Sequence, residues 1–256
     1  MPEAAVTMAF AAADEATPWP SSLPPWFAAL VVLGAWVALT SAATFLAWLR
    51  RAFLRPGRDD DLGRRYGGWA VVTGPTDGIG RAVALELARS GLSLVLVGRN
   101  PDKLARVKKE ALAAAPPSCE VRTVVFDLAA GDPREMARGV ARVAAAVEGL
   151  DVGVLVNNAG ATYPCAAYFH ELPAPAWEAV VRVNVEAATR MARAVVPAMA
   201  ARRRGAVVNV GSGCSVVVPA FPLYAVYAAS KAYVDQFSRS LSVEYKQYGV
   251  DIQCQV

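Results

Sequence analysis

The sequence predicts an α/β protein in which a doubly wound parallel sheet follows one long apolar helix. Three observations support this fold class. Six short apolar runs follow residue 68, segments of helical periodicity separate them, and an uncharged stretch precedes them all. Such runs are typical of strands buried on both faces, and the helices between them supply right-handed crossovers.

The elements can be placed in order along the chain. The expected strands are Trp69–Thr73, Leu92–Val97, Val121–Phe126, Val152–Val156, Ala206–Val210 and Val250–Val256. Helices are expected near residues 79–90, 101–115, 133–148, 176–201 and 224–248. With 256 residues, the chain has room for one domain of ordinary size plus an appendage.

The appendage is an uncharged segment near the amino terminus. As a helix rising ~1.5 Å per residue, residues 26–49 would reach ~36 Å, enough to cross a hydrocarbon core of ~30 Å. Trp26 and Trp48 lie near the ends, where amphipathic rings favour membrane interfaces, and Pro24 and Pro25 are expected to stop the helix on one side. The alternatives are a cleaved signal peptide and a buried core helix. The length and the acidic residues that precede the segment favour a transmembrane helix.

Charge predicts the orientation of this helix. Residues 1–49 contain three acidic and no basic residues, whereas residues 50–256 contain 26 basic against 19 acidic residues. An excess of basic residues favours the cytosolic side of a membrane. We therefore expect a short lumenal segment over 1–25, a cytosolic linker over 50–68 and a cytosolic domain over 69–256.

Composition excludes several classes of function. Apolar residues make up 55% and charged residues 19% of the chain, which excludes a disordered protein. The densest basic clusters, at 50–58 and 202–204, lie beside the apolar segment and at a helix end, so a nucleic-acid interface is not expected. The four cysteines form no C-x-x-C pair and His170 is the single histidine, so no metal site is expected.

A glycine-rich loop follows the first strand and opens a helix. Its spacing over Thr73–Gly80 is G-x-x-x-G-x-G. The first glycine permits a tight turn, the second lets the backbone approach a pyrophosphate, and the third allows close packing of helix on strand. This predicts a Rossmann-type dinucleotide site, although three glycines also suit a plain turn. The candidate cofactor-binding residues are Gly74, Thr76, Asp77, Gly78, Ile79 and Gly80.

The second strand indicates which dinucleotide binds. An NAD site commonly has an acidic residue at the end of this strand, but here the strand runs into Gly98, Arg99 and Asn100. A cation at this place can bind a 2′-phosphate, so Arg99 favours NADPH. The alternative is a solvated arginine at the start of the next helix.

Only one of the eight tyrosines has a lysine four residues later. On a helix this spacing places Tyr227 and Lys231 on one face, ~6 Å apart along the axis. A cation beside a phenol lowers the pKa of the phenol toward the range of a working proton donor. Carbonyl reduction needs such a donor, because hydride addition builds negative charge on the oxygen.

Together these motifs resemble the short-chain dehydrogenase/reductase family. The resemblance rests on Thr73–Gly80, Asn157-Asn158-Ala159-Gly160, Asn184 and the pair Tyr227 and Lys231. Longer stretches are similar to one branch, the plant very-long-chain 3-oxoacyl-CoA reductases of the endoplasmic reticulum; these are Trp69–Gly80, Asn100–Leu104, Tyr168–Glu171 and Tyr233–Phe237. The likeness covers the apolar segment and the chain after it.

The resemblance implies a role for each site residue. Tyr227 would protonate the substrate carbonyl, Lys231 would bind the nicotinamide ribose, and Asn184 would hold a water that continues the proton relay. Three more residues would contact the cofactor, the last of them at the adenine: Asn158, Gly160 and Asp127. Taken alone, the asparagines are equally typical of a turn after a strand and of a helix surface.

The family's catalytic serine has no direct counterpart. Its usual position, thirteen residues before the tyrosine, is Cys214. We expect Ser212 to orient the substrate carbonyl, with Ser215 as the second candidate and Cys214 as a small apolar filler.

The carboxyl end departs from the family pattern as well. The chain stops within the sixth expected strand, whereas the family fold continues with a loop over the nicotinamide, a helix and a seventh strand. We therefore expect a sheet truncated after its sixth strand, with an exposed edge, in a chain that is weakly stable and poorly active.

The function that the resemblance implies is NADPH-dependent reduction of very-long-chain 3-oxoacyl-CoA to 3-hydroxyacyl-CoA in fatty-acid elongation. The expected location is the endoplasmic reticulum membrane, with the catalytic domain in the cytosol beside the other elongase enzymes. A long acyl-CoA that partitions into the bilayer suits an anchored enzyme. The alternatives are a steroid or retinoid dehydrogenase, which shares this machinery, and a non-catalytic elongase partner that keeps the nucleotide site.

Overall fold

The computed structural model describes residues 24–53 and 62–256. The chain divides between Asp59 and Asp60 into two compact units, one that contains helix α2 and a larger α/β domain. Residues 1–23 of the expected lumenal segment and residues 54–61 of the expected linker lie outside the described residues.

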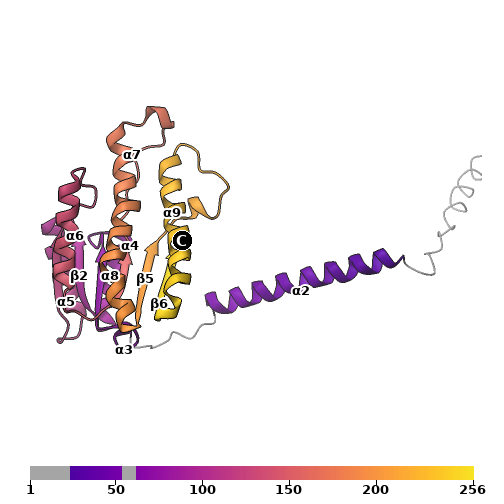
Figure 1. The fold of residues 1–256 in the computed structure, drawn as a ribbon, viewed down its shortest axis with the longest axis horizontal. Helices are drawn as coiled ribbons and strands as arrows, with labels where there is room; N and C mark the ends of the chain where they lie inside the picture. Colours follow the sequence, from indigo (N-terminus) through magenta and orange to yellow (C-terminus); the bar gives the residue numbers. More distant parts are fainter. Residues whose placement is uncertain (1–23, 54–61) are drawn as a thin grey trace, which may run out of the picture. The chain divides into compact units, whose positions relative to one another are not determined.

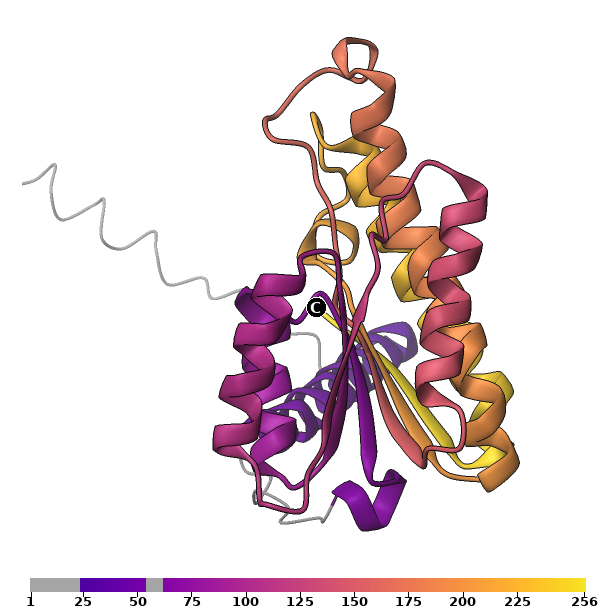
Figure 2. The same cartoon turned by 90° about the vertical axis from the view of Figure 1, so that its left-hand side faces the viewer.

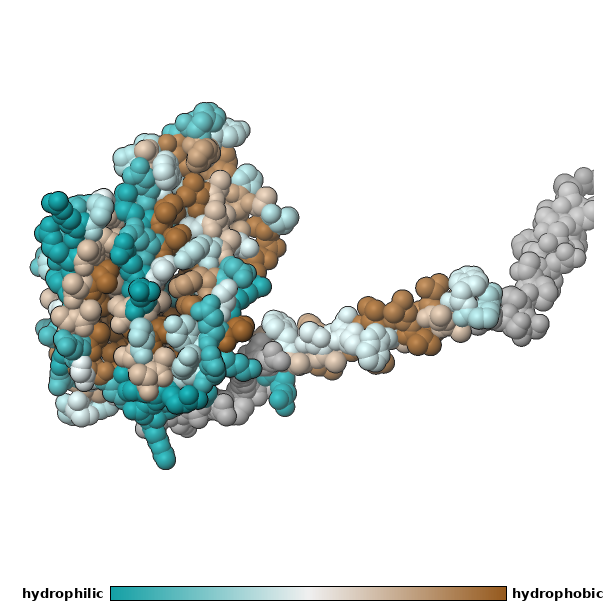
Figure 3. All heavy atoms as spheres, viewed as in Figure 1, coloured by the Kyte–Doolittle hydropathy of each residue, from teal (hydrophilic) through white to brown (hydrophobic). Residues whose placement is uncertain are grey.

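Helix α2, Pro25–Phe53, contains the whole of the predicted transmembrane segment. Pro25 was expected to stop the helix, but it is the first helical residue, because the N–H that proline lacks has no partner in a first turn anyway. The hydroxyls of Thr40 and Thr44 donate to carbonyls one turn earlier at 2.9 and 2.8 Å, so both are satisfied within the helix. Residues 25–50 are long and apolar enough to cross a membrane, and Figure 3 shows brown, hydrophobic residues along α2.

The domain is built on a sheet of six parallel strands in the order β3-β2-β1-β4-β5-β6. Figure 1 shows β5 and β6 of this sheet side by side. The strands are β1 (Trp69–Thr73), β2 (Ser93–Gly98), β3 (Val121–Val125), β4 (Val152–Asn157), β5 (Gly205–Val210) and β6 (Val250–Gln255). The order reverses between β1 and β4. In open α/β sheets such a reversal opens a crevice for ligands at the carboxyl ends of the strands.

Helices cover both faces of this sheet, and Figure 2 shows the two layers edge-on. On one face lie α4 (Gly78–Arg89) and α5 (Pro101–Ala114); on the other lie α6 (Pro133–Val147), α8 (Ala188–Arg202) and α9 (Ala225–Tyr245). Each face has its own buried apolar cluster. Shorter helices are α3 (Leu62–Tyr66), α7 (Ala174–Val181), a π-helical segment (Arg182–Ala187) and 3-10 turns at Phe169–Glu171, Gly213–Ser215 and Lys246–Tyr248.

The predicted parallel sheet is confirmed, with every strand within one residue of its expected bounds. The expectation that all strands are buried on both faces is confirmed for β1, β2 and β4 but is wrong for β3, β5 and β6, which alternate or mix buried and accessible residues. The physical reason differs between the strands. β3 and β6 lie at the edges of the sheet and are covered less completely, whereas the half-buried residues of the interior strand β5 line a cavity. The expected linker over 50–68 contains helix α3, which contacts β4 and β5.

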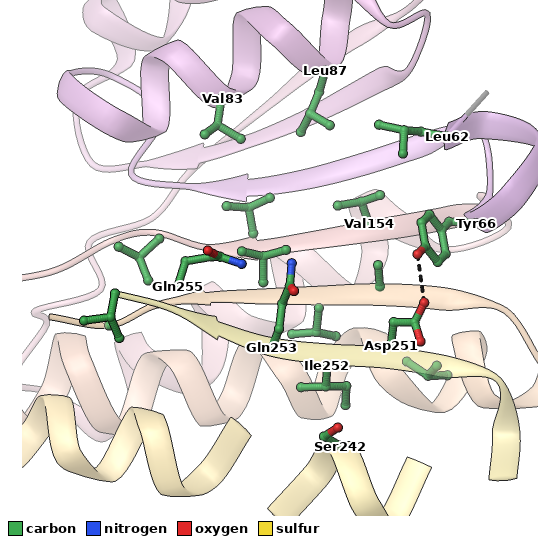
Figure 4. Close-up of a pocket in the computed structure, with 18 of the residues that line it drawn as sticks. Leu62, Tyr66, Val83, Leu87, Val154, Ser242, Asp251, Ile252, Gln253 and Gln255 are labelled. Atoms are coloured by element: carbon green, nitrogen blue, oxygen red, sulfur yellow. Dashed lines mark hydrogen bonds between the residues drawn. The ribbon is translucent and has the colours of Figure 1, made fainter. Parts of the chain in front are cut away.

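One face of β4, β5 and β6 borders an apolar cavity of about 920 Å³ (Figure 4). Leu62 of α3 and Val83 and Leu87 of α4 lie across it from the strands. At one end of the cavity, the hydroxyl of Tyr66 donates to the carboxylate of Asp251 at 2.8 Å. Within the described residues, β6 forms an edge of the sheet, as expected.

Candidate active site

The candidate site begins where the glycine loop after β1 meets the loop after β4. The hydroxyl of Thr73 accepts hydrogen bonds from the backbone N–H groups of Asn158 and Ala159, both at 3.1 Å. The side-chain amide of Asn158 in turn donates to the carbonyls of Thr73 and Gly74 at 3.1 and 3.0 Å. These bonds join the two loops at the point where the strand order reverses.

Two structural reasons explain the three glycines of the first loop. Gly74 and Gly78 have φ values of +62° and +50°, in the left-handed region that favours glycine. A Cβ on Gly80 would meet the Asn158 amide and the Gly74 carbonyl, so glycine is required for α4 to lie this close to the loops. A Cβ on Gly78 would meet nothing within 4 Å, so the space at the amino end of α4 is open to a ligand.

A cavity of about 720 Å³ lies beside these loops. Eight of the ten residues predicted to bind the cofactor through loops and strand ends line it: Gly74, Thr76, Asp77, Gly78, Arg99, Asp127, Asn158 and Gly160. The other two do not, because Ile79 is 62% exposed and lines the separate cavity beside β4, β5 and β6, and Gly80 is buried beneath the loop. The cavity thus brings together residues from the carboxyl ends of β1, β2, β3 and β4.

The charged residues around this cavity differ in their partners. Asp77 caps α4 by accepting from the N–H of Gly78 at 2.9 Å, and Asp127 accepts from the N–H of Ala129 at 3.0 Å. Within the described residues, Arg99 makes neither an ion pair nor a hydrogen bond. The two carboxylates therefore stabilise their own loops, while the guanidinium of Arg99 is available to an anion.

Helix α9 carries the predicted tyrosine and lysine. Lys231 is 5% exposed, its Nζ donates to the carbonyl of Val210 at 2.8 Å, and it lies 6.0 Å from the centre of the Tyr227 ring. Burial lowers the pKa of Lys231, and the nearby thiols of Cys254 and Cys214 act in the opposite direction. A Cβ on Gly160 would lie 3.6 Å from Nζ, so the amine faces the loop that borders the cavity.

Asn184 lies in the π-helical segment between α7 and α8. Its Oδ1 accepts from the N–H of Ala161 at 2.8 Å, and its Nδ2 donates to the carbonyl of Ala161 at 3.0 Å and to Oγ of Ser230 at 2.9 Å. Local π-helical turns are frequent at functional sites. The side chain braces the loop after β4 against α9, and its part in a proton relay stays a prediction.

The two candidate serines flank Cys214 and differ in what their hydroxyls do. Ser212 accepts from the N–H of Cys214 at 3.4 Å, and it donates to no group in the part of the chain that is described. Ser215 donates its proton to the carbonyl of Ser212 at 2.9 Å. The hydroxyl proton of Ser212 is therefore not used within the described residues, and its role in orienting a substrate carbonyl stays a prediction.

Three residues that shape the site were not predicted. Thr73 holds the loop after β4, and Ser230 links Asn184 to the carbonyl of Tyr227, to which it donates at 2.7 Å. Tyr163 accepts hydrogen bonds from the first turn of α9. For Thr73 there was a signal, since it directly precedes the first glycine. The partners of the other two are distant in sequence, so no local pattern could have found them.

The residues around the cavity fit a dinucleotide. The amino end of α4 offers backbone N–H groups beside the open space at Gly78, where a phosphate would be stabilised. The cation of Arg99 lies at the end of β2, where a 2′-phosphate would be recognised. The amine of Lys231 retains two further N–H donors after its bond to Val210.

Comparison with known proteins agrees with this geometry. A family model described as short chain dehydrogenase matches residues 68–256. A very-long-chain 3-oxoacyl-CoA reductase-like protein of Arabidopsis thaliana is 50% identical over 193 residues, covering 75% of this chain and 60% of that protein. The human inactive hydroxysteroid dehydrogenase-like protein 1 is 40% identical over 230 residues, covering 88% of this chain and 67% of that protein.

Solved structures show the same architecture. The short-chain dehydrogenase from Sphingobium yanoikuyae in complex with NADPH has a TM-score of 0.64 and 30% sequence identity, covering 73% of this chain and 68% of that one. The present chain spans 60% of the length of the Arabidopsis relative.

Proposed function

Since the chain belongs to the short-chain dehydrogenase family, we propose that it is an NADPH-dependent reductase of very-long-chain 3-oxoacyl-CoA. The observation that carries the proposal is the position of the Lys231 amine, which lies 6.0 Å from the Tyr227 ring and faces Gly160. Gly160 lines the cavity of the glycine loop, whereas Tyr227 and Lys231 lie beyond that lining. The product would be the 3-hydroxyacyl-CoA, formed in the first reduction of fatty-acid elongation.

NADPH, when bound, supplies the hydride for the carbonyl carbon. The chain would hold it through the N–H groups at the start of α4, through Arg99 at the 2′-phosphate and through Lys231 at a ribose hydroxyl. Supporting observations are the free guanidinium, the open space at Gly78 and the NADPH in the structure of the Sphingobium relative.

The proton would come from Tyr227. Among the described residues its phenol oxygen makes no hydrogen bond, so it is available to a carbonyl oxygen. The amine of Lys231, 6.0 Å from the ring, would in its protonated form stabilise the charge that develops as the phenol loses its proton. Ser212 would donate a second hydrogen bond to the same carbonyl oxygen, and Asn184 would lie on the path of proton resupply.

The loop before α9 supports a substrate with a long apolar chain. Residues 216–223 have the sequence Val-Val-Val-Pro-Ala-Phe-Pro-Leu, and all eight are exposed. The loop connects the segment of Ser212 and Ser215 to the start of α9, so its apolar surface begins where the carbonyl would bind. An alkyl chain laid on this surface gains ~0.8 kcal/mol for each methylene that it buries.

We further propose that α2 anchors the protein in the endoplasmic reticulum membrane with the domain in the cytosol. Its length and composition and the basic residues that follow it support this arrangement. The same location would bring the enzyme close to the other elongase enzymes and to substrates that partition into the bilayer.

A non-catalytic elongase partner is the second candidate. The human relative, whose name describes it as inactive, favours it. The presence of Tyr227, Lys231 and a serine with a free hydroxyl favours the reductase. A steroid or retinoid dehydrogenase would use the same groups, so the substrate panel must include such ketones.

The deciding experiment is NADPH oxidation by the 256-residue chain in detergent, with a long 3-oxoacyl-CoA and with a steroid ketone. We expect turnover of the acyl-CoA that falls by about 10²–10⁴-fold in Tyr227→Phe. Tyr233→Phe, on the same helix, serves as the control. Absence of turnover in a folded sample, or turnover that Tyr227→Phe leaves unchanged, would contradict the proposal and favour the non-catalytic partner.

A further inference from the structure

Helix α9 starts just before the proposed catalytic pair, and its first turn lacks a cap of its own. The residue at the cap position, Tyr224, makes no side-chain hydrogen bond to the helix. The first N–H groups of a helix have no partner within it, and a capping oxygen ordinarily accepts from the second or third helical residue. In α9 these residues are Val226 and Tyr227.

Tyr163, from the loop after β4, supplies the missing acceptor. Its phenol oxygen lies 3.1 Å from the backbone nitrogen of Val226 and 3.4 Å from that of Tyr227. Tyr163 is 2% exposed, and its ring stacks on the ring of Tyr224 with centroids 5.3 Å apart and planes within 5°. Burial and stacking together fix the direction in which the phenol oxygen points.

We propose that Tyr163 is a positioning residue for the reduction, capping α9 from outside the helix and thereby fixing the backbone of Tyr227. This inference rests on the proposed function, because it presumes that Tyr227 donates the proton. The loop that carries Tyr163 also carries Gly160, which borders the cofactor cavity and faces the amine of Lys231. Tyr163 therefore couples the position of the proton donor to the loop against which the cofactor would bind.

The test is Tyr163→Phe in the full chain, which keeps the stacked ring and removes only the oxygen. We expect faster amide hydrogen exchange in the first turn of α9, measured by mass spectrometry on peptides that contain Val226 and Tyr227. We expect kcat to fall about tenfold, because displacement of a catalytic group by a fraction of an ångström slows proton transfer. The solvent deuterium isotope effect on kcat should rise, while the KM for NADPH should change less than about twofold, since the phosphate contacts are untouched.

Tyr233→Phe is the matched control. It also removes a phenol oxygen that ties α9 to another element, here the hydroxyl of Thr189 at 2.8 Å. Amide hydrogen exchange in the first turn of α9 and the kcat of this variant should match those of the wild type.

The outcomes separate the two proposals. Wild-type exchange or wild-type kcat in Tyr163→Phe would overturn the positioning role, and so would a fall in kcat that comes with a matching loss of NADPH binding and of thermal stability. Full activity of Tyr227→Phe would overturn the proposed function instead. The exchange measurement needs no turnover, so it decides the capping of α9 in either case.

Discussion

Arg99 is the side chain that we propose selects the cofactor. It follows β2 directly, it lines the cavity, and it has no acidic partner among the described residues. A guanidinium in this place would recognise the 2′-phosphate through charge-assisted hydrogen bonds.

The first prediction is that Arg99→Gln weakens NADPH far more than NADH. Loss of a charge-assisted hydrogen bond of about 1.5–3 kcal/mol would raise the KM for NADPH about 10–100-fold. The KM for NADH, which lacks the phosphate, should change little. Steady-state kinetics with both cofactors measure this, with Lys103→Gln one turn further along as control. Equal effects on the two cofactors would contradict the assignment.

Lys231 should make the stability of the protein depend on pH. Burial lowers the pKa of Lys231 in the folded chain below its ordinary value of 10.5, so between these values the unfolded chain binds more protons. The free energy of unfolding therefore rises with pH through this range. At lower pH the cost of burying the charged amine is present in full, and above the unfolded pKa it is gone.

The second prediction follows from this increase of the free energy of unfolding with pH. The free energy of unfolding of the wild type, relative to Lys231→Met, should increase as the pH rises toward the ordinary lysine pKa of 10.5. Urea denaturation of both chains across a pH series provides the measurement. A relative stability that stays level or decreases with pH would show that the lysine is not desolvated in the folded state.

Local spacing accounts for the site residues that could be predicted. The glycines, Arg99 and the pair of Tyr227 and Lys231 are recognisable because the chemistry depends on their positions within one turn or one helix. The capping role of Tyr163 and the role of Ser230 between Asn184 and α9 depend on contacts between segments distant in sequence. No pattern in a single sequence contains that information.

At the scale of elements, the apolar loop 216–223 is the feature with a direct consequence for the substrate. Val217 is 77% exposed, so its side chain contributes little to the packing of the domain. Its place in the loop between Ser212 and α9 puts it within the proposed path of the acyl chain.

The third prediction is that Val217→Asp impairs long substrates selectively. A carboxylate on the acyl path would repel a buried alkyl chain, so we expect the KM for a very-long-chain 3-oxoacyl-CoA to rise about tenfold. A short-chain 3-oxoacyl-CoA should be affected little. Val243→Asp, at a position 78% exposed on α9, is the matched control. The measurement is the KM of both variants for 3-oxoacyl-CoA substrates of different chain length. Equal increases in KM for short and long substrates would refute the acyl path.

The elements themselves were predictable to different degrees. Strand positions follow from runs of apolar residues, which is why β1 and β4 begin at their expected residues. The helix expected over 176–201 is interrupted by the π-helical turn around Asn184, where a side chain bonds to a distant loop and the backbone adapts to it. Burial could not be predicted equally well, because it depends on where a strand lies in the sheet.

At the scale of the whole molecule, the chain has the long helix α2 in addition to the α/β domain. Its threonine hydroxyls bond within the helix, and its large apolar side chains are exposed. Both properties are expected of a helix that has lipid as its solvent.

The fourth prediction concerns this helix. Leu33→Arg combined with Val37→Arg should abolish stable membrane insertion, since each arginine near the middle of a span costs about 2.5–3.5 kcal/mol. Flotation of the chain with phosphatidylcholine vesicles after carbonate extraction measures the effect. Phe53→Arg, at the end of the helix, should float like the wild type. Flotation of the double variant would show that the domain, rather than α2, holds the protein on the vesicle.

The hydrogen bonds between Thr73 and Asn158 have one more consequence, which concerns the exchange of the dinucleotide between turnovers. They join the loops after β1 and β4 through protein groups alone, so the two loops are held together before any dinucleotide binds. A spent dinucleotide could leave and a fresh one enter without the backbone becoming ordered anew each time. The binding site would then be preformed rather than assembled around its ligand. The rate of dinucleotide exchange would be set by diffusion and by the strength of the phosphate contacts.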